Sequence, residues 1–224
     1  CLRANSQQQP LQPGQLHIAI IGAGATGVEL AAEMHNTIRE FVAFGLDRIH
    51  PERDIKITIV EAAPKLLPAL PERLSVAVLG LLNKLNVEVL TGEKVTEVSA
   101  QGVKTANGRE ISAELVVWAA GIKAPDFLSN IDGLETNRIN QLMVTQMLQT
   151  TRDPDVFAFG DCASCPWPEK NGWIPPRAQS AHQQASHLYK VLPRRLRGEE
   201  LQAFAYRDFG SLVSLRKLST VGSP

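Results

Sequence analysis

The stretch Leu16-His17-Ile18-Ala19-Ile20-Ile21-Gly22-Ala23-Gly24-Ala25-Thr26-Gly27-Val28 decides the fold of this chain. The apolar run before the glycines has the length and the β-branched content of a buried strand. After the glycines, apolar residues recur at helical spacing over residues 28–45, and a glycine ends that pattern. The glycines therefore lie between a strand and a helix, the setting in which G-x-G-x-x-G indicates dinucleotide binding.

Each glycine of this pattern has its own expected role. Gly22 allows a tight turn, Gly24 lets the backbone approach a pyrophosphate, and Gly27 lets the helix pack closely on the strand. The free amides and the positive dipole end of the helix favour phosphate. A purely structural glycine-rich turn is the alternative interpretation.

The rest of the first half alternates between strand and helix patterns. Residues 55–61 form a second predicted strand and residues 71–85 a second helix with a proline at its start. Short alternating runs over 87–98 and around Val103 and Ile111 indicate an antiparallel meander, and residues 115–121 a buried strand. This order predicts an α/β fold, a Rossmann-like parallel sheet with an antiparallel flap.

The two ends of the chain have a different texture. The first fourteen residues are polar and rich in glutamine, and we expect a linker there. After Pro125 the sequence is irregular, with predicted strands near 142–148 and 156–159, a helix over 176–197 and a strand over 211–215. We therefore expect a linker over 1–14, a dinucleotide-binding domain over 15–124 and a separate segment over 125–224.

Two acidic positions accompany the glycines. Glu61 ends the second strand, where a carboxylate binds a ribose 2′-hydroxyl and repels a 2′-phosphate, which favours NADH over NADPH. Glu61 lies 34 residues after Gly27, whereas about 20 is typical, and a long first helix with a charged insert over 46–54 accounts for the excess. A solvated strand-end glutamate is the alternative. Glu29 lies at the start of the first helix, where the dipole alone favours a carboxylate.

A second group of polar residues lies in the later half. Gly160 and Asp161 follow a predicted strand, where a carboxylate can accept hydrogen bonds from a polyol, although such a pair is often only a turn. Gln179, His182 and Gln183 share one face of a helix that begins after two prolines. Its N-terminal amides could stabilise a reduced flavin, or the helix could be a solvated polar helix.

The composition narrows the class of protein. The chain has 224 residues, with 23 basic and 23 acidic side chains, so nothing suggests nucleic acid as a partner. No apolar run reaches the roughly 18 residues that span a bilayer. Among three cysteines, Cys162 and Cys165 form a C-x-x-C that is either a structural pair or a redox or metal site.

Taken together, these motifs resemble the type II NADH dehydrogenases, single-subunit NADH:quinone oxidoreductases that contain FAD, and especially their bacterial branch. The resemblance covers nearly the whole chain from Leu16 on. Its segments, in chain order, are residues 20–29, 60–62, 117–122, 156–163, 176–183 and 210–215. The Ala-Gln-x-Ala-His-Gln helix points to quinone reduction, because the glycine motifs are common to flavoproteins with two dinucleotide-binding domains.

The resemblance implies a fold and a set of functional residues. The NADH domain would be inserted in an FAD domain that is incomplete here. NADH would be held by Gly22, Gly24, Gly27 and Glu61, with Ala120 and Gly121 lining the dinucleotide. Glu29 would lie by the nicotinamide, Gly160 and Asp161 would hold the FAD ribityl chain, and Gln179 and Gln183 would lie at the quinone end of the flavin. Hydride would pass from NADH to flavin N5, and two electrons would then pass to a membrane quinone, without proton pumping.

The chain also departs from the family pattern. The family's N-terminal FAD fingerprint and its C-terminal membrane-attachment segment are not in this sequence, and the first residue is Cys1 rather than a methionine. We therefore expect a piece of a longer protein that is inactive by itself. The whole enzyme is expected to be peripheral on the cytoplasmic face of a bacterial inner membrane, and a homodimer is possible.

Two other functions fit the binding motifs. One is a soluble FAD-dependent reductase of a disulfide, a ferredoxin or dioxygen. The other is a non-catalytic module that senses NADH, since binding motifs alone do not establish catalysis.

Overall fold

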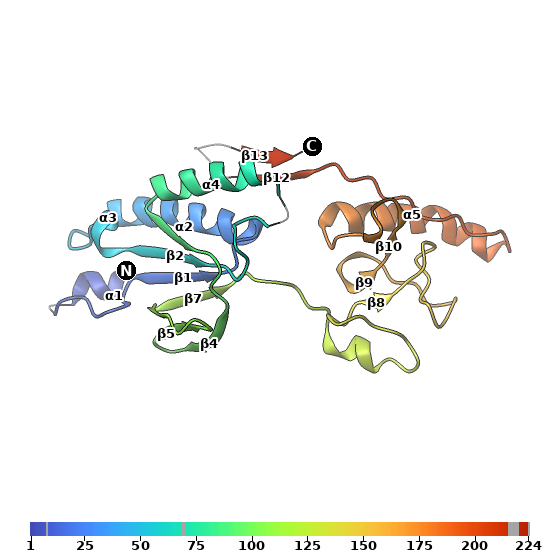
Figure 1. The fold of residues 1–224 in the computed structure, drawn as a ribbon, viewed down its shortest axis with the longest axis horizontal. Coiled ribbons are helices and arrows are strands. Elements are labelled where there is room, and N and C mark those ends of the chain that lie inside the picture. The colour runs from blue at the N-terminus through green and yellow to red at the C-terminus, as the bar shows by residue number, and fades with distance from the viewer. Residues whose placement is uncertain (8, 69, 215–219, 224) are drawn as a thin grey trace. The chain divides into compact units, whose positions relative to one another are not determined.

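The computed structural model describes residues 1–7, 9–68, 70–214 and 220–223 (Figure 1). The chain divides into two compact units. The first unit comprises Cys1–Gly121 together with Gly210–Pro224, and the second unit comprises Ile122–Phe209.

A parallel sheet forms the centre of the first unit. Its strands are β1 (His17–Ile21), β2 (Lys56–Val60), β3 (Val87–Leu90) and β7 (Leu115–Trp118), in the order β3-β2-β1-β7. Ile20 of β1 lies opposite Ile59 of β2 and Val117 of β7. The predicted α/β fold with a parallel sheet is confirmed.

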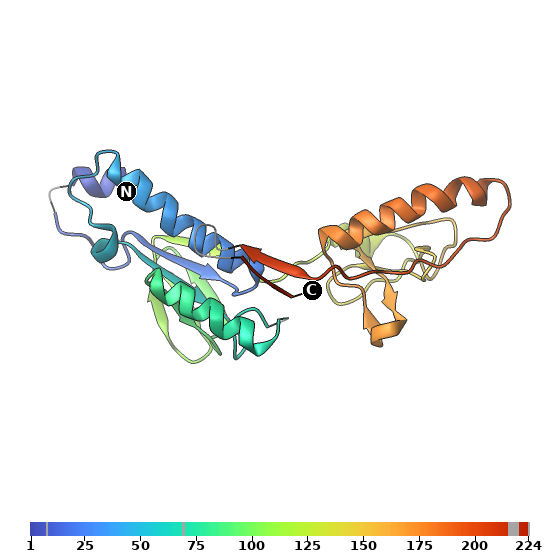
Figure 2. The same cartoon turned by 90° about the horizontal axis from the view of Figure 1, so that it is seen from above.

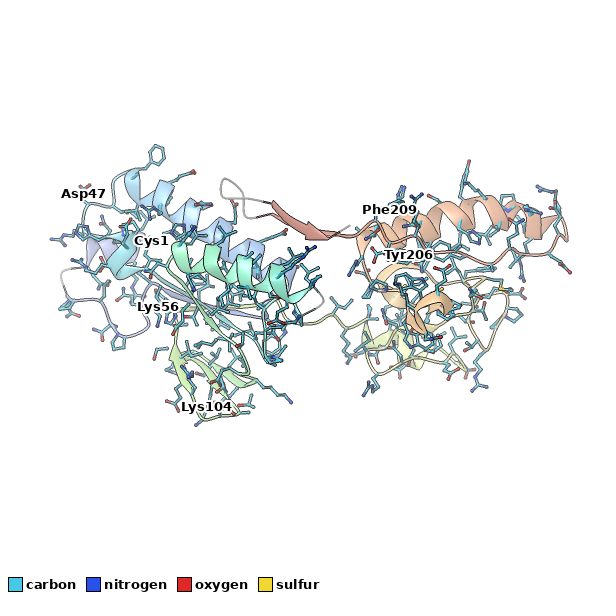
Figure 3. The ribbon with its side chains drawn as sticks, turned by 45° about the horizontal axis from the view of Figure 1, so that its top comes forward. Cys1, Asp47, Lys56, Lys104, Tyr206 and Phe209 are labelled. Carbon is cyan, nitrogen blue, oxygen red and sulfur yellow. The ribbon has the colours of Figure 1, made fainter. Side chains whose placement is uncertain are left out.

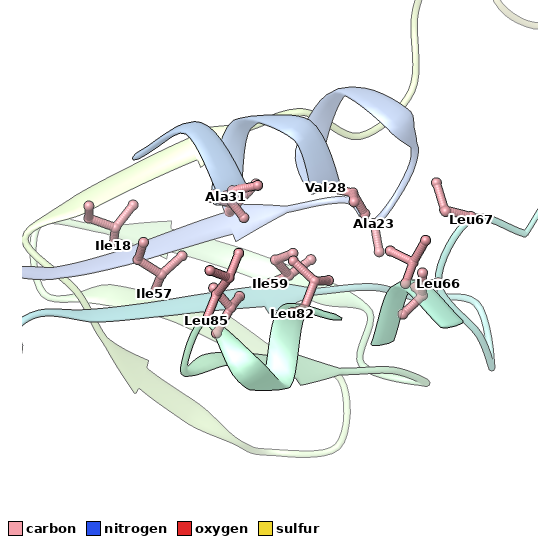
Figure 4. Packing of buried hydrophobic residues seen from close by; sticks show 14 of the residues in the cluster. Ile18, Ala23, Val28, Ala31, Ile57, Ile59, Leu66, Leu67, Leu82 and Leu85 are labelled. Carbon is pink, nitrogen blue, oxygen red and sulfur yellow. The ribbon is translucent and has the colours of Figure 1, made fainter. Parts of the chain in front are cut away.

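Two helices cover one face of this sheet, α2 (Ala25–Ala43) and α4 (Glu72–Lys84), as Figures 1 and 2 show. Ile18, Ile20, Ile57 and Ile59 alternate along β1 and β2 with residues of the opposite face and pack against Val28, Ala31, Val78 and Leu82 of the helices (Figure 4). Burial of this apolar surface is the main force that holds the helices on the sheet.

An antiparallel sheet covers the other face. It consists of β4 (Val95–Ser99), β5 (Gly102–Thr105) and β6 (Glu110–Ser112). Ala19 and Ile21 of β1 pack against its Val103 and Ile111. Val87–Leu90, expected in this meander, instead pairs in parallel with β2. An alternating apolar pattern fits an edge strand of either sheet, so the pattern alone could not separate them.

One further expectation for this unit is wrong. The strand near residue 115 is an edge strand that ends at Trp118, and Leu115 and Trp118 are 45% and 59% exposed, so it is not buried. The first fourteen residues, where we expect a linker, contain a short helix, α1 (Leu2–Ser6), whose Ala4 packs with Leu16, Leu46 and Ile49. A second short helix, α3 (Pro51–Asp54), precedes β2.

The second unit has little regular structure apart from one long helix, α5 (Ala178–Leu196). Its strands are β8 (Leu142–Met143), β9 (Ala163–Ser164), β10 (Pro166–Trp167) and β11 (Gly172–Trp173), and its 3-10 helices are η1 (Asp126–Asn130), η2 (Gly160–Cys162) and η3 (Pro168–Lys170). The strands expected over 142–148 and 156–159 are reduced to β8 and isolated bridges such as Gln149 to Phe157. Leu148, Leu188 and Val191 lie in its core.

The end of the chain returns to the first unit. β12 (Ser211–Ser214) and β13 (Thr220–Ser223) form an antiparallel pair, and their backbones lie near α2 and α4 respectively. The expected strand over 211–215 is observed as β12, while Leu215 lies outside the described residues. Among the described residues, no helix has the length and apolar character needed to cross a membrane.

Candidate functional site

The glycine-rich loop connects β1 to α2, and its glycines serve different purposes. Gly22 has a φ of +107°, and a Cβ there would lie 2.8 Å from Cα of Ala120. A Cβ on Gly27 would lie 1.9 Å from the carbonyl oxygen of Gly22, whereas no atom lies within 4 Å of the Cβ position on Gly24. Packing therefore requires Gly22 and Gly27, and Gly24 leaves open space at the start of the helix.

The N-terminus of α2 faces this space. Gly24 is the N-cap of the 19-residue helix and provides no side-chain cap. The first amides of a helix have no carbonyl partner within it, and the helix dipole adds positive potential there. The loop is thus suited to a phosphate group.

Glu61 is joined directly to the glycine-rich loop. The backbone N–H of Ala23 donates to Oε2 of Glu61 over 2.7 Å, and the N–H of Ala63 donates to Oε1 over 2.7 Å. The side chain is only partly buried. Glu61 is therefore more than a solvated strand-end glutamate: its carboxylate holds the loop in shape, a role that sequence analysis missed.

Ala120 and Gly121 follow β7 beside the same loop. The backbone of Ala120 is what a Cβ on Gly22 would meet, and the indole N–H of Trp118 donates to the Ala120 carbonyl over 2.7 Å. Gly121 is exposed, with a φ of +69°. The structure thus brings Gly22, Glu61 and Ala120 together at the carboxyl ends of β1, β2 and β7, where ligands bind in open α/β sheets.

Glu29 lies in the first turns of α2, just after the glycines, and is partly buried. Glu33, one turn further, accepts a hydrogen bond from Oγ1 of Thr37 over 3.3 Å. The first turn of the helix itself contains no acidic residue. The role of Glu29 beside a nicotinamide stays a prediction.

In the second unit, Gly160 and Asp161 form the turn at the start of η2. Gly160 has a φ of +73°, a conformation that favours glycine. Its N–H donates to Oε1 of Gln184 over 2.7 Å, and Nε2 of Gln141 donates to the Asp161 carbonyl over 2.9 Å. The Asp161 side chain is exposed. Two glutamines that sequence analysis missed therefore hold this turn.

Gln179 and Gln183 bind the extended segment that follows α5, labelled at Tyr206 and Phe209 in Figure 3. Gln183 accepts from the N–H of Arg207 over 3.0 Å and donates to its carbonyl over 2.8 Å. Gln179 accepts from the N–H of Phe209 over 3.0 Å. Gln179 and Gln183 are four residues apart on the helix, and Arg207 and Phe209 are two residues apart on the extended segment. Both separations are roughly 6 Å, so each glutamine amide reaches the backbone of every second residue of the segment.

The C-x-x-C pair differs in environment at its two cysteines. Cys165 is 1% exposed, and burial raises the pKa of its thiol to about 11. Cys162 is partly buried, and its thiol donates to the carbonyl of Phe159. A thiolate is the reactive form of cysteine, so the raised pKa favours the structural interpretation of this pair.

The curated relatives of this chain include several type II NADH:quinone oxidoreductases. The type II NADH:quinone oxidoreductase of Haemophilus influenzae is 43% identical over 97% of this chain and 48% of its own length. That of Staphylococcus saprophyticus is 32% identical over 92% of this chain and 51% of its own length. The chain spans about half the length of these curated relatives. The resemblance to type II NADH dehydrogenases is confirmed.

Solved structures share the fold. The structure of NDH2 from Plasmodium falciparum in complex with NADH matches 92% of this chain and 57% of its own chain length. The TM-score is 0.78 and the sequence identity is 21%. The structure of an FAD-dependent pyridine nucleotide-disulphide oxidoreductase from Desulfovibrio vulgaris matches 90% of this chain and 47% of its own chain length. The TM-score is 0.67 and the sequence identity is 26%.

These comparisons confirm the flavoprotein fold and the expected cofactors, NAD(H) and FAD. The family whose description is pyridine nucleotide-disulphide oxidoreductase matches residues 1–185, and the chain belongs to this family.

Proposed function

We propose that the protein containing this chain is an NADH:quinone oxidoreductase that uses FAD. The observation that carries the proposal is the 43% identity to a type II NADH:quinone oxidoreductase over 97% of the chain. The glycine-rich loop with Glu61 and the Gly160–Asp161 turn lie within the compared stretch, and they support the proposal that two dinucleotides bind.

In the first unit, NADH would be bound through the loop and its neighbours. Gly24 leaves space for the pyrophosphate, and the amides at the start of α2 would face its charge. The carboxylate of Glu61 would accept hydrogen bonds from the ribose hydroxyls and repel a 2′-phosphate, so that NADH is preferred to NADPH. Ala120 and Gly121 would line the dinucleotide, and Glu29 would lie by the nicotinamide.

In the second unit, Asp161 and Gly160 would hold the ribityl chain of FAD. The positive φ of Gly160 and the exposed carboxylate of Asp161 fit a polyol approaching the backbone closely. Two-electron transfer is the chemistry supplied by FAD when bound: NADH gives a hydride, and the quinone gains two electrons and two protons, the second proton coming from solvent. Gln179 and Gln183 would form the quinone end, in addition to holding residues 207–209.

The domain assignment and the location follow as further proposals. Residues 15–124 would bind NADH, and 1–14 would lead into that domain. Residues 125–224 would complete an FAD domain in the whole protein, whereas in this structure Gly210–Pro224 belongs to the first unit. The whole enzyme would be peripheral on the cytoplasmic face of a bacterial inner membrane, as a possible homodimer, and would reduce a membrane quinone. Disulfide reduction through Cys162 and Cys165 is less favoured, because burial raises the pKa of the Cys165 thiol to about 11.

The test is the electron acceptor of the full-length protein. Purified protein with FAD should oxidise NADH with a soluble quinone analogue at least tenfold faster than with a ferredoxin, a small disulfide or dioxygen. NADPH should be used at least tenfold less well than NADH. A ferredoxin or a disulfide as the best acceptor would support the soluble-reductase alternative, and binding of NADH without any turnover would support the sensing module.

A further inference from the structure

Two glutamines behind the Gly160–Asp161 turn are almost completely buried. Gln184 is 2% exposed and Gln141 is 6% exposed. Gln184 lies on the core face of α5, between Ser180 and Leu188 at intervals of four residues. That face packs in the apolar core of the second unit, where a leucine or methionine would be the ordinary residue.

Burying an amide is unfavourable unless it makes hydrogen bonds, so its contacts indicate why it is there. Oε1 of Gln184 accepts the N–H of Gly160 over 2.7 Å. Nε2 of Gln141 donates to the carbonyl of Asp161 over 2.9 Å, and Oε1 of Gln141 accepts from Nδ2 of Asn137 over 2.9 Å. The two amides thus bind consecutive residues of one turn.

These contacts hold the backbone of Gly160 and Asp161 in one of the several conformations that it could otherwise adopt. A glycine with positive φ is easily lost to other conformations, because glycine has many of them. With the Gly160 N–H and the Asp161 carbonyl both engaged from the core side, the direction in which the Asp161 side chain leaves the turn is set. That side chain is exposed.

We propose that Gln184 and Gln141 are positioning residues that hold Gly160 and Asp161 in the geometry that binds the ribityl hydroxyls of FAD. This inference rests on the proposed function, because it takes FAD as the ligand of Asp161. Gln184 and Gln141 act through the backbone from the buried side and are not catalytic residues.

The experiment measures FAD affinity of the full-length protein, after removal of the flavin, by titration of flavin fluorescence. Gln184→Met fills the same space but has no acceptor for Gly160, and we expect FAD to bind at least tenfold more weakly. Gln141→Leu should weaken binding about threefold.

Ser180→Ala is the matched control. Ser180 is also buried on this face of α5, but its hydroxyl donates to the Pro175 carbonyl and not to the turn. Ser180→Ala should lower the unfolding temperature and leave the FAD affinity within about twofold of that of the unsubstituted protein. An equal loss of affinity in Ser180→Ala and Gln184→Met would show general destabilisation and overturn the positioning role.

A double-variant comparison with Asp161→Asn completes the test. If Gln184 acts through Asp161, the loss of affinity in the double variant will be smaller than the product of the two single losses. Unchanged FAD affinity in Gln184→Met, or losses that multiply fully, would overturn the positioning role while leaving the proposed function intact. An unsubstituted protein that binds no FAD would overturn the proposed function and this inference together.

Discussion

The two units of this chain each present a glycine turn, and each turn is held by a side-chain oxygen from a neighbouring element. In the first unit, Oε2 of Glu61 accepts the N–H of Ala23 over 2.7 Å. In the second unit, Oε1 of Gln184 accepts the N–H of Gly160, also over 2.7 Å. The lengths are equal, but Glu61 is charged and partly buried, whereas Gln184 is neutral and 2% exposed.

This difference separates two ways of building a binding turn. A carboxylate is costly to bury, so Glu61 stays at the surface, where it can hold the loop and contact a ligand. A neutral amide can be buried once it is hydrogen-bonded, but from the core it reaches only the backbone. The second turn therefore divides the work between Gln184 behind it and the exposed Asp161 in front.

The largest effect is expected from breaking the turn of the first unit at Gly27. Gly27→Ala would place a Cβ 1.9 Å from the Gly22 carbonyl oxygen, so the loop and α2 must move apart. We expect a loss of about 3 kcal/mol in the free energy of unfolding, measured by denaturant titration.

Gly24→Ala is the control: the added Cβ meets no atom within 4 Å, so the free energy of unfolding should stay within about 1 kcal/mol of that of the unsubstituted protein. NADH binding by Gly24→Ala should nevertheless fall at least tenfold, and equal stability of the two variants would contradict this account.

A smaller effect is expected from removing the charge that distinguishes the two turns. Glu61→Gln leaves one amide donor facing the N–H of Ala23 or Ala63, which costs about 1–3 kcal/mol of stability. NADH should bind about tenfold more weakly in equilibrium titrations, and the preference for NADH over NADPH should narrow. Glu97→Gln, at an exposed glutamate of β4, is the matched control and should change neither quantity. If NADPH discrimination survives Glu61→Gln, the role of Glu61 at the ribose is wrong.

The smallest effect concerns a buried histidine of the first unit. Burial, and secondarily Lys56, lower the pKa of His17 below its ordinary value of 6.5, with Ser112 and Glu88 opposing. The unfolded chain then binds more protons than the folded chain just below pH 6.5, so stability is complete above that pH and falls as the pH drops through it. Urea titrations at pH 7.5 and 5.5 should show a smaller pH dependence for His17→Gln than for the parent. His182→Gln, at an exposed histidine of the second unit, is the control, and its free energy of unfolding should change between the two pH values as much as that of the unsubstituted protein.

Sequence patterns predicted the elements around the glycine-rich loop because each pattern there is local. The alternation in β1 and the helical spacing in α2 identify both elements without knowledge of their neighbours. The same reasoning failed for Val87–Leu90, since the period of a strand does not tell which sheet it joins. It also failed in the second unit, where β8 and β9 have two residues each and the remaining backbone pairing is scattered over loops and isolated bridges.

The supporting residues show the same limit. A sequence-level signal for Gln184 did exist: it occupies an apolar-face position of α5, at the spacing of Ser180, Leu188 and Val191, where a polar residue is unusual. Its partner Gly160 lies 24 residues away, and nothing local indicates it. Likewise, Glu61 was expected at a ribose, while its bond to Ala23, 38 residues away, was not.

The sequence by itself determined the elements around the glycine-rich loop, the glycine positions and the kind of cofactor, because strand, helix and glycine requirements there are set by neighbours along the chain. Only the tertiary structure decided which side chains hold the two turns. Those hydrogen bonds join residues distant in sequence, and their existence depends on burial and orientation, which arise when the core forms. The contacts of Gln179 and Gln183 with residues 207–209 are of this kind: a polar helix face was visible in the sequence, and the extended segment that it binds was not.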